Sequence, residues 1–436
     1  MKHLFFGGVH PADRKELTGR GIPAPAPIPA QVVIPLRQHI GAPCTPLVKP
    51  GDTVGLGQKL GDGEGLCVPV HASVSGLVTA VEPRPHPGGG QVLSVVIEND
   101  YQDTPASALE PHLDLSGLTK EEIVSIIGEA GIVGMGGATF PTDVKTVAGM
   151  GRVDTLIANA CECEPYITAD DALLCTYPEQ VLRGMGALMA VLEPKRAVLA
   201  VEDNKSEAVG ILKKQMETFP GIELLILPTR YPQGAEKQLI QAVTGRQVPP
   251  GALPKDVGCA VFNAATFASI YKAVYEGEPV TRRIVTVTGE GVREPKNLIV
   301  RIGTPFSEVI AAAGGLTGDV WKVLSGGPMM GVAQADLAVP VVKGTNAVLC
   351  LSRAQDREGA HPQCIRCAKC VTACPMSLQP LYLYRFDQAG DLTALRRLNL
   401  TDCIECGCCA YVCPGRLPLV ESFRAGKRAV KEENAS

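Results

Sequence analysis

The chain has 436 residues, of which 45% are hydrophobic and 20% charged, and its formal net charge is −4. This length predicts about three domains, each with enough apolar residues for a hydrophobic core. Aromatic residues make up only 4% of the chain and no long basic run occurs. Stacking platforms and basic surfaces for nucleic acids are therefore not expected.

Residues 1–115 are predicted to form a compact β module. Short β-rich segments at 31–36, 66–70, 76–82 and 91–98 alternate with turn signals at 49–52 and 87–90. The pattern is similar to the barrel-sandwich fold of biotinyl and lipoyl carriers. Ser73 and Val74 stand where such carriers have the lysine that they modify, so we expect a structural module. The stretch after Met1 is too short for a signal peptide, and no window is long and apolar enough to span a bilayer. A soluble or peripheral protein is expected.

Residues 116–280 are predicted to form an α/β domain. Helical segments at 120–130, 205–219 and 234–244 alternate with strand-like segments at 154–159, 197–201 and 223–227. Strands separated by helices indicate a mostly parallel sheet.

Two smaller parts complete a multidomain α/β protein. In residues 281–354, β runs at 283–289 and 298–302 flank a helical segment at 305–313, which indicates a β-grasp-type, SLBB-like module. Residues 355–436 are expected to form a helical domain. Its charged tail, residues 423–436, is expected to be frayed.

The pattern C-x2-C-x2-C-x3-C-P occurs twice near the C-terminus, beginning at Cys364 and at Cys403. It is typical of cubane 4Fe–4S clusters: three thiolates hold one cluster, and the fourth reaches across to the neighbouring cluster. Zinc sites, the main alternative beside disulfides, usually pair two C-x2-C units across a longer loop. The first cluster is assigned to Cys364, Cys367, Cys370 and Cys413, and the second to Cys403, Cys406, Cys409 and Cys374.

The other eight of the sixteen cysteines are scattered. They form no disulfide framework, which fits a reducing compartment. Cys408 lies inside the second motif but breaks the ligand spacing, so we expect a spectator. Cys161 and Cys163 are expected to be packing cysteines.

A glycine-rich loop at 131–145 is the second informative feature. Its glycines allow backbone N–H groups to approach an anionic or planar ligand closely, and Lys145 can neutralise a phosphate. The spacing is neither the Rossmann nor the Walker pattern. By itself, the loop is weak evidence for a ligand site and favours a structural turn.

This loop and the segments at 159–166, 231–237 and 263–266 resemble the NADH- and FMN-binding subunit of respiratory complex I. They resemble more closely the C subunit of the Rnf complex, a membrane-associated ferredoxin:NAD oxidoreductase. In that family the same segments occur in the same order, between a barrel-like N-terminal module and two terminal clusters. The resemblance covers essentially the whole chain.

The resemblance implies residues for FMN and NADH, but no catalytic acid or base. The glycine loop would contribute Gly134, Gly136, Gly137 and Ala138 against the flavin, Phe140 at the nicotinamide side and Lys145 near the phosphate. The other segments would contribute Asn159, Glu162 and Glu164 at the isoalloxazine ring, Tyr231, Gly234 and Glu236 at nucleotide or flavin, and Asn263 and Thr266 at the closing side of the pocket. This chain departs from the complex I pattern in two places. That subunit has two successive glutamates after the glycine, where this chain has Ala235 and then Glu236. Cys161 and Cys163 stand where it has other small or acidic residues.

The family further implies a hydride-to-electron converter that links NADH, FMN and two 4Fe–4S clusters. It would be a peripheral subunit at the cytoplasmic face of the bacterial inner membrane. Its partners would be the other Rnf membrane subunits, which move sodium ions or protons, and the ferredoxin-side iron–sulfur subunit. Two alternatives stay open: a flavin- and cluster-containing cobalamin reductase of a bacterial microcompartment, and an electron wire with clusters but no working nucleotide site.

Overall fold

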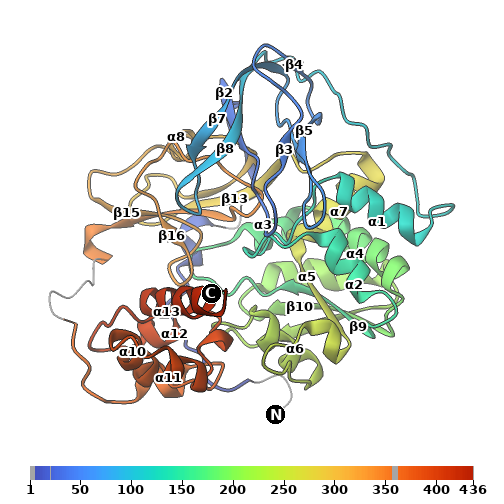
Figure 1. Cartoon of the computed structure of the whole chain (residues 1–436). Coiled ribbons are helices and arrows are strands. Elements are labelled where there is room, and N and C mark those ends of the chain that lie inside the picture. Colours follow the sequence, from blue (N-terminus) through green and yellow to red (C-terminus); the bar gives the residue numbers. More distant parts are fainter. Residues whose placement is uncertain (1–4, 20, 356–361, 436) are drawn as a thin grey trace.

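The computed structural model describes residues 5–19, 21–355 and 362–435 (Figure 1). A β-rich part, built from blue N-terminal strands and yellow-to-orange later strands, packs with a green-to-yellow α/β part and a small red helical part. Among the described residues, no helix combines the length and the apolar character that crossing a bilayer requires. The start of the predicted helical domain, residues 356–361, lies outside the described residues.

The N-terminal module consists of two antiparallel sheets. One has the order β2 (Gln31–Pro35), β8 (Gln91–Asn99), β7 (Gly76–Pro85) and β4 (Thr53–Val54), and the other β3 (Thr45–Pro46), β5 (Lys59–Asp62) and β6 (Val70–His71). The strands predicted at 31–36, 76–82 and 91–98 are confirmed. The strand predicted at 66–70 is wrong, because residues 63–69 are irregular and only Val70 pairs. Pro69 has no N–H for a ladder, and Gly65 has a positive φ of 71°.

The SLBB-like module shares a hydrophobic core with the N-terminal module. Its mixed sheet has the order β1 (Ala24–Pro25), β14 (Lys296–Arg301), β13 (Arg282–Thr288), β17 (Ala347–Ser352), β15 (Val320–Ser325) and β16 (Val332–Ala333), and α8 (Phe306–Ala312) packs on it. Ile34 and Val95 of the first module lie in one buried cluster with Val300 and Phe306 of the second. The buried hydroxyl of Ser73 donates to the Ile302 carbonyl. The position of the carrier lysine is therefore packed against a neighbouring module.

The α/β domain contains the parallel sheet β11 (Ile222–Leu227), β10 (Arg196–Glu202), β9 (Thr155–Ala160) and β12 (Cys259–Asn263), as predicted. One face is covered by α1 (Lys120–Glu129), α3 (Ala169–Thr176), α4 (Pro178–Leu192), α5 (Ser206–Gln215) and α7 (Ala264–Glu276), and the other by α6 (Glu236–Thr244). Helices α4 and α7 pack backbone to backbone, since a Cβ at Gly184 would lie 1.9 Å from the Phe267 carbonyl oxygen. Apolar side chains cover both sheet faces, as parallel sheets require.

The C-terminal domain is helical: α9 (Lys369–Ala373), α10 (Pro380–Gln388), α11 (Leu392–Arg397), α12 (Cys408–Tyr411) and α13 (Leu419–Ala435). The expectation of a frayed tail is wrong, because α13 continues to Ala435. Phe423 and Val430 on this helix are buried in the core of the domain, so an apolar face within the charged tail holds it in place. The N-terminal segment lies against this domain, where Gly8 N–H donates to Ala373 O (2.9 Å).

Candidate functional site

The topology of the parallel sheet places a ligand site at the ends of β9 and β12. Strands β9, β10 and β11 follow one another across the sheet, whereas β12 lies on the opposite side of β9. Ligands bind at such a switch point, beyond the carboxyl ends of the strands. Asn159 and Asn263 are register partners at the ends of these two strands, so both predicted residues lie at this point.

The glycine loop closes over this switch point. Gly134 N–H donates to Phe140 O (2.9 Å) and Thr139 N–H donates to Gly134 O (3.1 Å), which makes a tight turn. A Cβ at Gly136 would lie 3.4 Å from the Asn263 side chain, while a Cβ at Gly137 would meet no atom within 4 Å. The tip of the loop therefore presents bare backbone to open space beside Asn263. This cradle fits a planar or anionic ligand.

Two predicted residues support the loop through hydrogen bonds. The Thr266 hydroxyl accepts from Met135 N–H (3.0 Å). Asn263 Oδ1 caps α7 by accepting from Ala265 N–H (2.9 Å), and its Nδ2 donates to Asp170 (2.6 Å). The polar atoms of these side chains thus hold the loop and the strand end in position.

Helix α2 (Thr142–Gly149) begins within the segment 131–145, directly after its glycine turn, and α6 and α7 begin near the same edge. Lys145 on α2 forms an ion pair with Glu236 at the start of α6 (2.6 Å). Asn159 Nδ2 donates to Gly234 O (2.8 Å). Helix N-termini and a partly exposed ammonium favour an anion such as a phosphate. The structure therefore brings Lys145, Asn159, Gly234 and Glu236 together at one edge.

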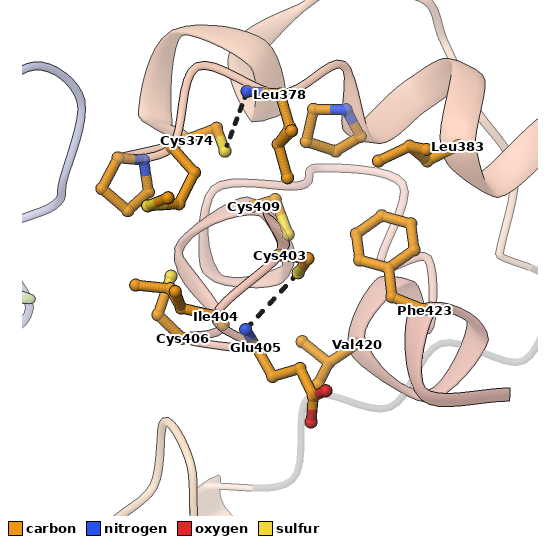
Figure 2. Close-up of a pocket in the computed structure, with 14 residues that line it drawn as sticks. Cys374, Leu378, Leu383, Cys403, Ile404, Glu405, Cys406, Cys409, Val420 and Phe423 are labelled. Atoms are coloured by element: carbon orange, nitrogen blue, oxygen red, sulfur yellow. Dashed lines mark hydrogen bonds between the residues drawn. The ribbon is translucent and has the colours of Figure 1, made fainter. Parts of the chain in front are cut away.

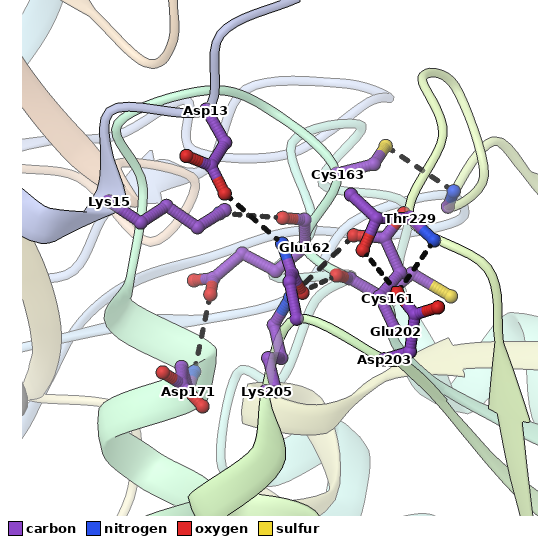
Figure 3. Close-up of polar contacts among 12 residues, drawn as sticks. Asp13, Lys15, Cys161, Glu162, Cys163, Asp171, Glu202, Asp203, Lys205 and Thr229 are labelled. Atoms are coloured by element: carbon purple, nitrogen blue, oxygen red, sulfur yellow. Dashed lines mark hydrogen bonds and ion pairs between the residues drawn. The ribbon is translucent and has the colours of Figure 1, made fainter. Parts of the chain in front are cut away.

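Glu162 and Glu164 follow β9 and are half-buried, and Figure 3 shows Glu162 among its polar contacts. The carboxylate of Glu162 accepts from Asp170 N–H (2.6 Å) and Asp171 N–H (3.2 Å), at the start of α3. Glu164 Oε2 accepts from Met329 N–H (3.2 Å) in the SLBB-like module. Burial raises the pKa of Glu162 to about 8 and that of Glu164 to about 7. The Glu162 carboxylate thus links the end of β9 to α3, and the Glu164 carboxylate links it to the SLBB-like module. Contact of either side chain with a flavin remains a prediction.

Tyr231 connects the α/β domain to the helical domain. Its ring is buried, and its O–H donates to Cys406 O (2.7 Å), within the second cysteine motif. The backbone of Tyr231 pairs with Val9 of the N-terminal segment. The family resemblance implies a place for Tyr231 near nucleotide or flavin, but it did not indicate this link.

A buried charged network behind Glu162 was not predicted (Figure 3). Lys15 Nζ donates to the carbonyls of Glu162 (2.9 Å), Glu164 (3.1 Å) and Ile167. Lys205 Nζ donates to Cys161 O (2.6 Å), and burial raises the pKa of the Cys161 thiol. A protonated, enclosed thiol agrees with the predicted packing role. The residues of the network lie as far apart in sequence as Lys15 and Lys205, so no local pattern could have revealed it.

The two cysteine motifs fold alike. Arg366 and Ala368 in the first motif have φ of 56° and 60°, and Glu405 and Gly407 at the same offsets in the second have 55° and 79°. Successive left-handed turns of this kind point backbone N–H groups inward. Each motif then enters a short helix, α9 or α12. The equal spacing thus produces equal local structure.

Four of the eight predicted ligands line one pocket: Cys374, Cys403, Cys406 and Cys409 (Figure 2). Burial, then proximity to Cys406, Cys403 and Cys374, raises the pKa of the Cys409 thiol. Leu378 N–H donates to Cys374 Sγ and Glu405 N–H to Cys403 Sγ, both at 3.4 Å. The remaining wall is mostly apolar. Four thiols with N–H donors in an apolar pocket fit a buried cubane cluster.

The other predicted set is more exposed. Cys364 and Cys367 are exposed, and Cys370 and Cys413 are half-buried. Burial, and then the Cys413 thiol of the other motif, raises the pKa of Cys370.

Comparisons with known proteins decide the family. The chain is 45% identical to the C subunit of the Na⁺-translocating ferredoxin:NAD⁺ oxidoreductase complex of Acetobacterium woodii, over 99% of this chain and 98% of that protein. It is 43% identical to the C subunit of the proton-translocating complex of Clostridium ljungdahlii, over 88% and 84%. It is 42% identical to the C subunit of the ion-translocating oxidoreductase complex of Rhodobacter capsulatus, over 98% and 83%. The chain belongs to the RnfC family.

Four family models match parts of the chain in the predicted order. They are the RnfC barrel sandwich hybrid domain (3–102), the Nuo51 FMN-binding domain (127–272), the SLBB domain (284–333) and the 4Fe-4S dicluster domain (363–416). A solved NAD⁺-reducing [NiFe]-hydrogenase in the H2-reduced state shares the fold, with a TM-score of 0.53 and 22% identity over 73% of this chain and 64% of that one. The predicted fold class, the relation to the FMN-binding protein of complex I and the cofactors FMN and two 4Fe–4S clusters are confirmed. This member of the RnfC family is thus an electron-transfer protein.

Proposed function

We propose that this chain is the peripheral NAD(H) subunit of a ferredoxin:NAD oxidoreductase complex at the cytoplasmic face of a bacterial inner membrane. It exchanges electrons between NADH and two 4Fe–4S clusters through FMN. Other subunits of the complex move Na⁺ or H⁺ and contact ferredoxin. The names of the relatives support this assignment, since they are the C subunits of Na⁺- and proton-translocating ferredoxin:NAD⁺ oxidoreductases.

One observation carries the proposal: a single short loop touches both candidate sites. In the loop that leads into α6, Tyr231 donates to the carbonyl of Cys406, a predicted cluster ligand. Three residues later, Gly234 accepts from Asn159 at the switch point of the sheet. A flavin at the switch point would therefore lie one loop away from the buried cluster, and that proximity suits electron transfer.

The residues of this chain would bind and orient FMN, whose own chemistry accepts a hydride and releases electrons singly. Lys145 and the N-terminus of α2 would neutralise the phosphate. Gly136 and Gly137 allow the backbone to approach the ring system. We assign no proton transfer to Glu164 or Glu236.

For the clusters, we propose the two ligand sets that the spacing predicts. Cys374, Cys403, Cys406 and Cys409 hold the buried cluster, and Cys364, Cys367, Cys370 and Cys413 hold the exposed one. Because Cys406 contacts Tyr231, the buried cluster is the one nearer to the flavin. The exposed cluster then faces the next electron carrier.

Addition of NADH to the purified chain, with FMN and reconstituted clusters, tests the proposal. The flavin absorbance should bleach, and electrons should then reach an external acceptor. Cys364→Ser or Cys403→Ser should spare flavin reduction and block the onward transfer, whereas Cys350→Ser, buried in β17, should affect neither step. If NADH leaves bound FMN oxidised, or FMN does not bind, the protein is an electron wire instead.

A further inference from the structure

Three side chains outside the electron-transfer sites converge in the N-terminal module. One ring nitrogen of His39 and the sulfurs of Cys44 and Cys67 all lie within 4.8 Å of one another. The two sulfurs are 3.5 Å apart. All three residues are buried, with exposed fractions of 6%, 3% and 9%. Neither cysteine belongs to the two cluster motifs, so electron transfer gives them no role.

The distance between the two sulfurs is close to that in a tetrahedral metal site. With Zn–S bonds of about 2.3 Å and a Zn–N bond of about 2.0 Å, two thiolates on one zinc lie about 3.8 Å apart, and a thiolate and an imidazole nitrogen about 3.5 Å apart. The observed sulfur–sulfur distance is close to the first value. It is far longer than the disulfide bond of about 2.05 Å.

The histidine is available as a ligand. Its Nδ1 is buried and has no hydrogen-bond partner, and its Nε2 accepts only a long bond from Val68 N–H (3.4 Å). A buried imidazole nitrogen without a partner is free to bind a cation, and neutral imidazole is the commonest metal ligand in proteins.

The ligands lie on two irregular loops rather than on strands. His39 and Cys44 flank residues 40–43, Cys67 follows residues 63–66, and most side chains of both stretches are exposed. Ala42 N–H donates to Leu66 O (3.1 Å), which joins the two loops. Loops of this kind have little regular structure of their own, and a shared cation would cross-link them. The exposed stretches also leave a route for a cation to enter.

We propose that His39, Cys44 and Cys67 bind one Zn²⁺ ion, with a water molecule as the fourth ligand. Binding releases two thiol protons to solvent, so that two thiolates and a neutral imidazole surround the divalent cation and the site has no net charge. Lys343 does not compete for the sulfurs, because its ammonium donates to Pro69 O (2.7 Å) and Gly131 O (2.6 Å).

The site would also steady the flavin loop. Ile40, next to His39, donates its N–H to Thr139 O (3.1 Å) at the end of the glycine turn. A cation that fixes residues 39–44 would therefore fix one support of that turn. This structural support of the glycine turn is separate from electron transfer, and it would hold whether or not the flavin accepts electrons.

Zinc analysis of the full chain tests the proposal independently of activity. Elemental analysis should find one zinc per chain in addition to the cluster iron. Zinc K-edge absorption, which iron does not disturb, should show two sulfurs at about 2.3 Å and one nitrogen at about 2.0 Å. If the chain is isolated without zinc, it should take up one equivalent in competition with a chromophoric chelator.

Variants separate this site from the cluster cysteines. His39→Gln and the double variant Cys44→Ser/Cys67→Ser should lose more than about 100-fold in zinc affinity, because removing mere hydrogen-bond partners of a ligand already costs 10–100-fold. Cys350→Ser, at another buried thiol, should keep the zinc. Zinc with four sulfurs, zinc retained by the double variant, no uptake at all, or a Cys44–Cys67 disulfide in acid-quenched protein would each overturn the proposal. The absorption spectrum of the unaltered chain decides the matter even if a variant fails to fold.

Discussion

Replacement of Tyr231 by phenylalanine removes one oxygen atom from the junction between the α/β domain and the buried cluster. The lost O–H donates to Cys406 O at 2.7 Å, and the ring is only 2% exposed. A carbonyl left without its buried donor costs about 1–3 kcal/mol. Each 1.4 kcal/mol is a factor of ten, so local opening around Cys406 should become about 5- to 150-fold more frequent.

Hydrogen exchange with mass spectrometry, under conditions where closing outpaces exchange, measures this opening directly. Amides of residues 406–412 should exchange faster in Tyr231→Phe by that factor, whereas those of β8 should not change. Tyr382→Phe on α10, whose ring is 44% exposed, is the matched control and should leave both segments unchanged. Equal protection of residues 406–412 in Tyr231→Phe and the parent chain would refute the inferred role of the hydroxyl.

Three further substitutions test the surrounding structure. The pKa of Glu164 rises from 4.5 when unfolded to about 7 when folded, so this carboxyl increasingly destabilises the fold between pH 4.5 and 7, and the loss stays constant above. Glu164→Gln should flatten the fall of unfolding free energy with pH and stabilise the protein at pH 8 by up to about 3 kcal/mol. Urea unfolding at a series of pH values, followed by the fluorescence of the single tryptophan, measures this dependence. The same pH dependence in the variant and the parent chain would contradict the assignment. Gly184→Ala should lower stability by more than about 3 kcal/mol, because its Cβ would overlap the Phe267 carbonyl, whereas Gly186→Ala in the same helix meets no atom and should be neutral or stabilising in thermal unfolding. Cys408→Ser should keep eight irons per chain, since its thiol is a spectator; loss of four irons in an iron assay would make it a ligand.

Local patterns predicted the features that depend on local geometry. Three thiolates can wrap one cluster only at a tight spacing, so the motifs at Cys364 and Cys403 were recognisable without any tertiary information. The strands of the parallel sheet were also recognisable, because both faces of the sheet are buried and each strand is therefore a nearly continuous run of apolar residues. The helix at the C-terminus was missed because its charged residues dominate the composition, while a few apolar residues such as Phe423 and Val430 hold it.

Features that depend on distant residues could not be predicted in this way. Lys15 reaches carbonyls that lie 147 and 149 residues further along the chain. His39 and Cys44 meet Cys67 only because β3 pairs with β5, which brings the loops beside these two strands together. Neither group has a spacing that sequence patterns recognise, since the fold and not the local chain sets the distance.

The segment after β9 shows how these distant contacts serve the site. Residues Glu162 and Tyr166 have φ of 46° and 70°, a left-handed conformation that costs energy for non-glycine residues. The Lys15 ammonium donates hydrogen bonds to three carbonyls of this segment, and the Glu162 carboxylate accepts from Asp170 N–H at the start of α3. These contacts, which come from the N-terminal segment and from α3, offset the cost of the turns. The strained segment is therefore held partly from outside the α/β domain, by Lys15, and it fixes the end of β9 where Asn159 lies. The order of the flavin site thus depends on residues far outside the flavin-binding sequence.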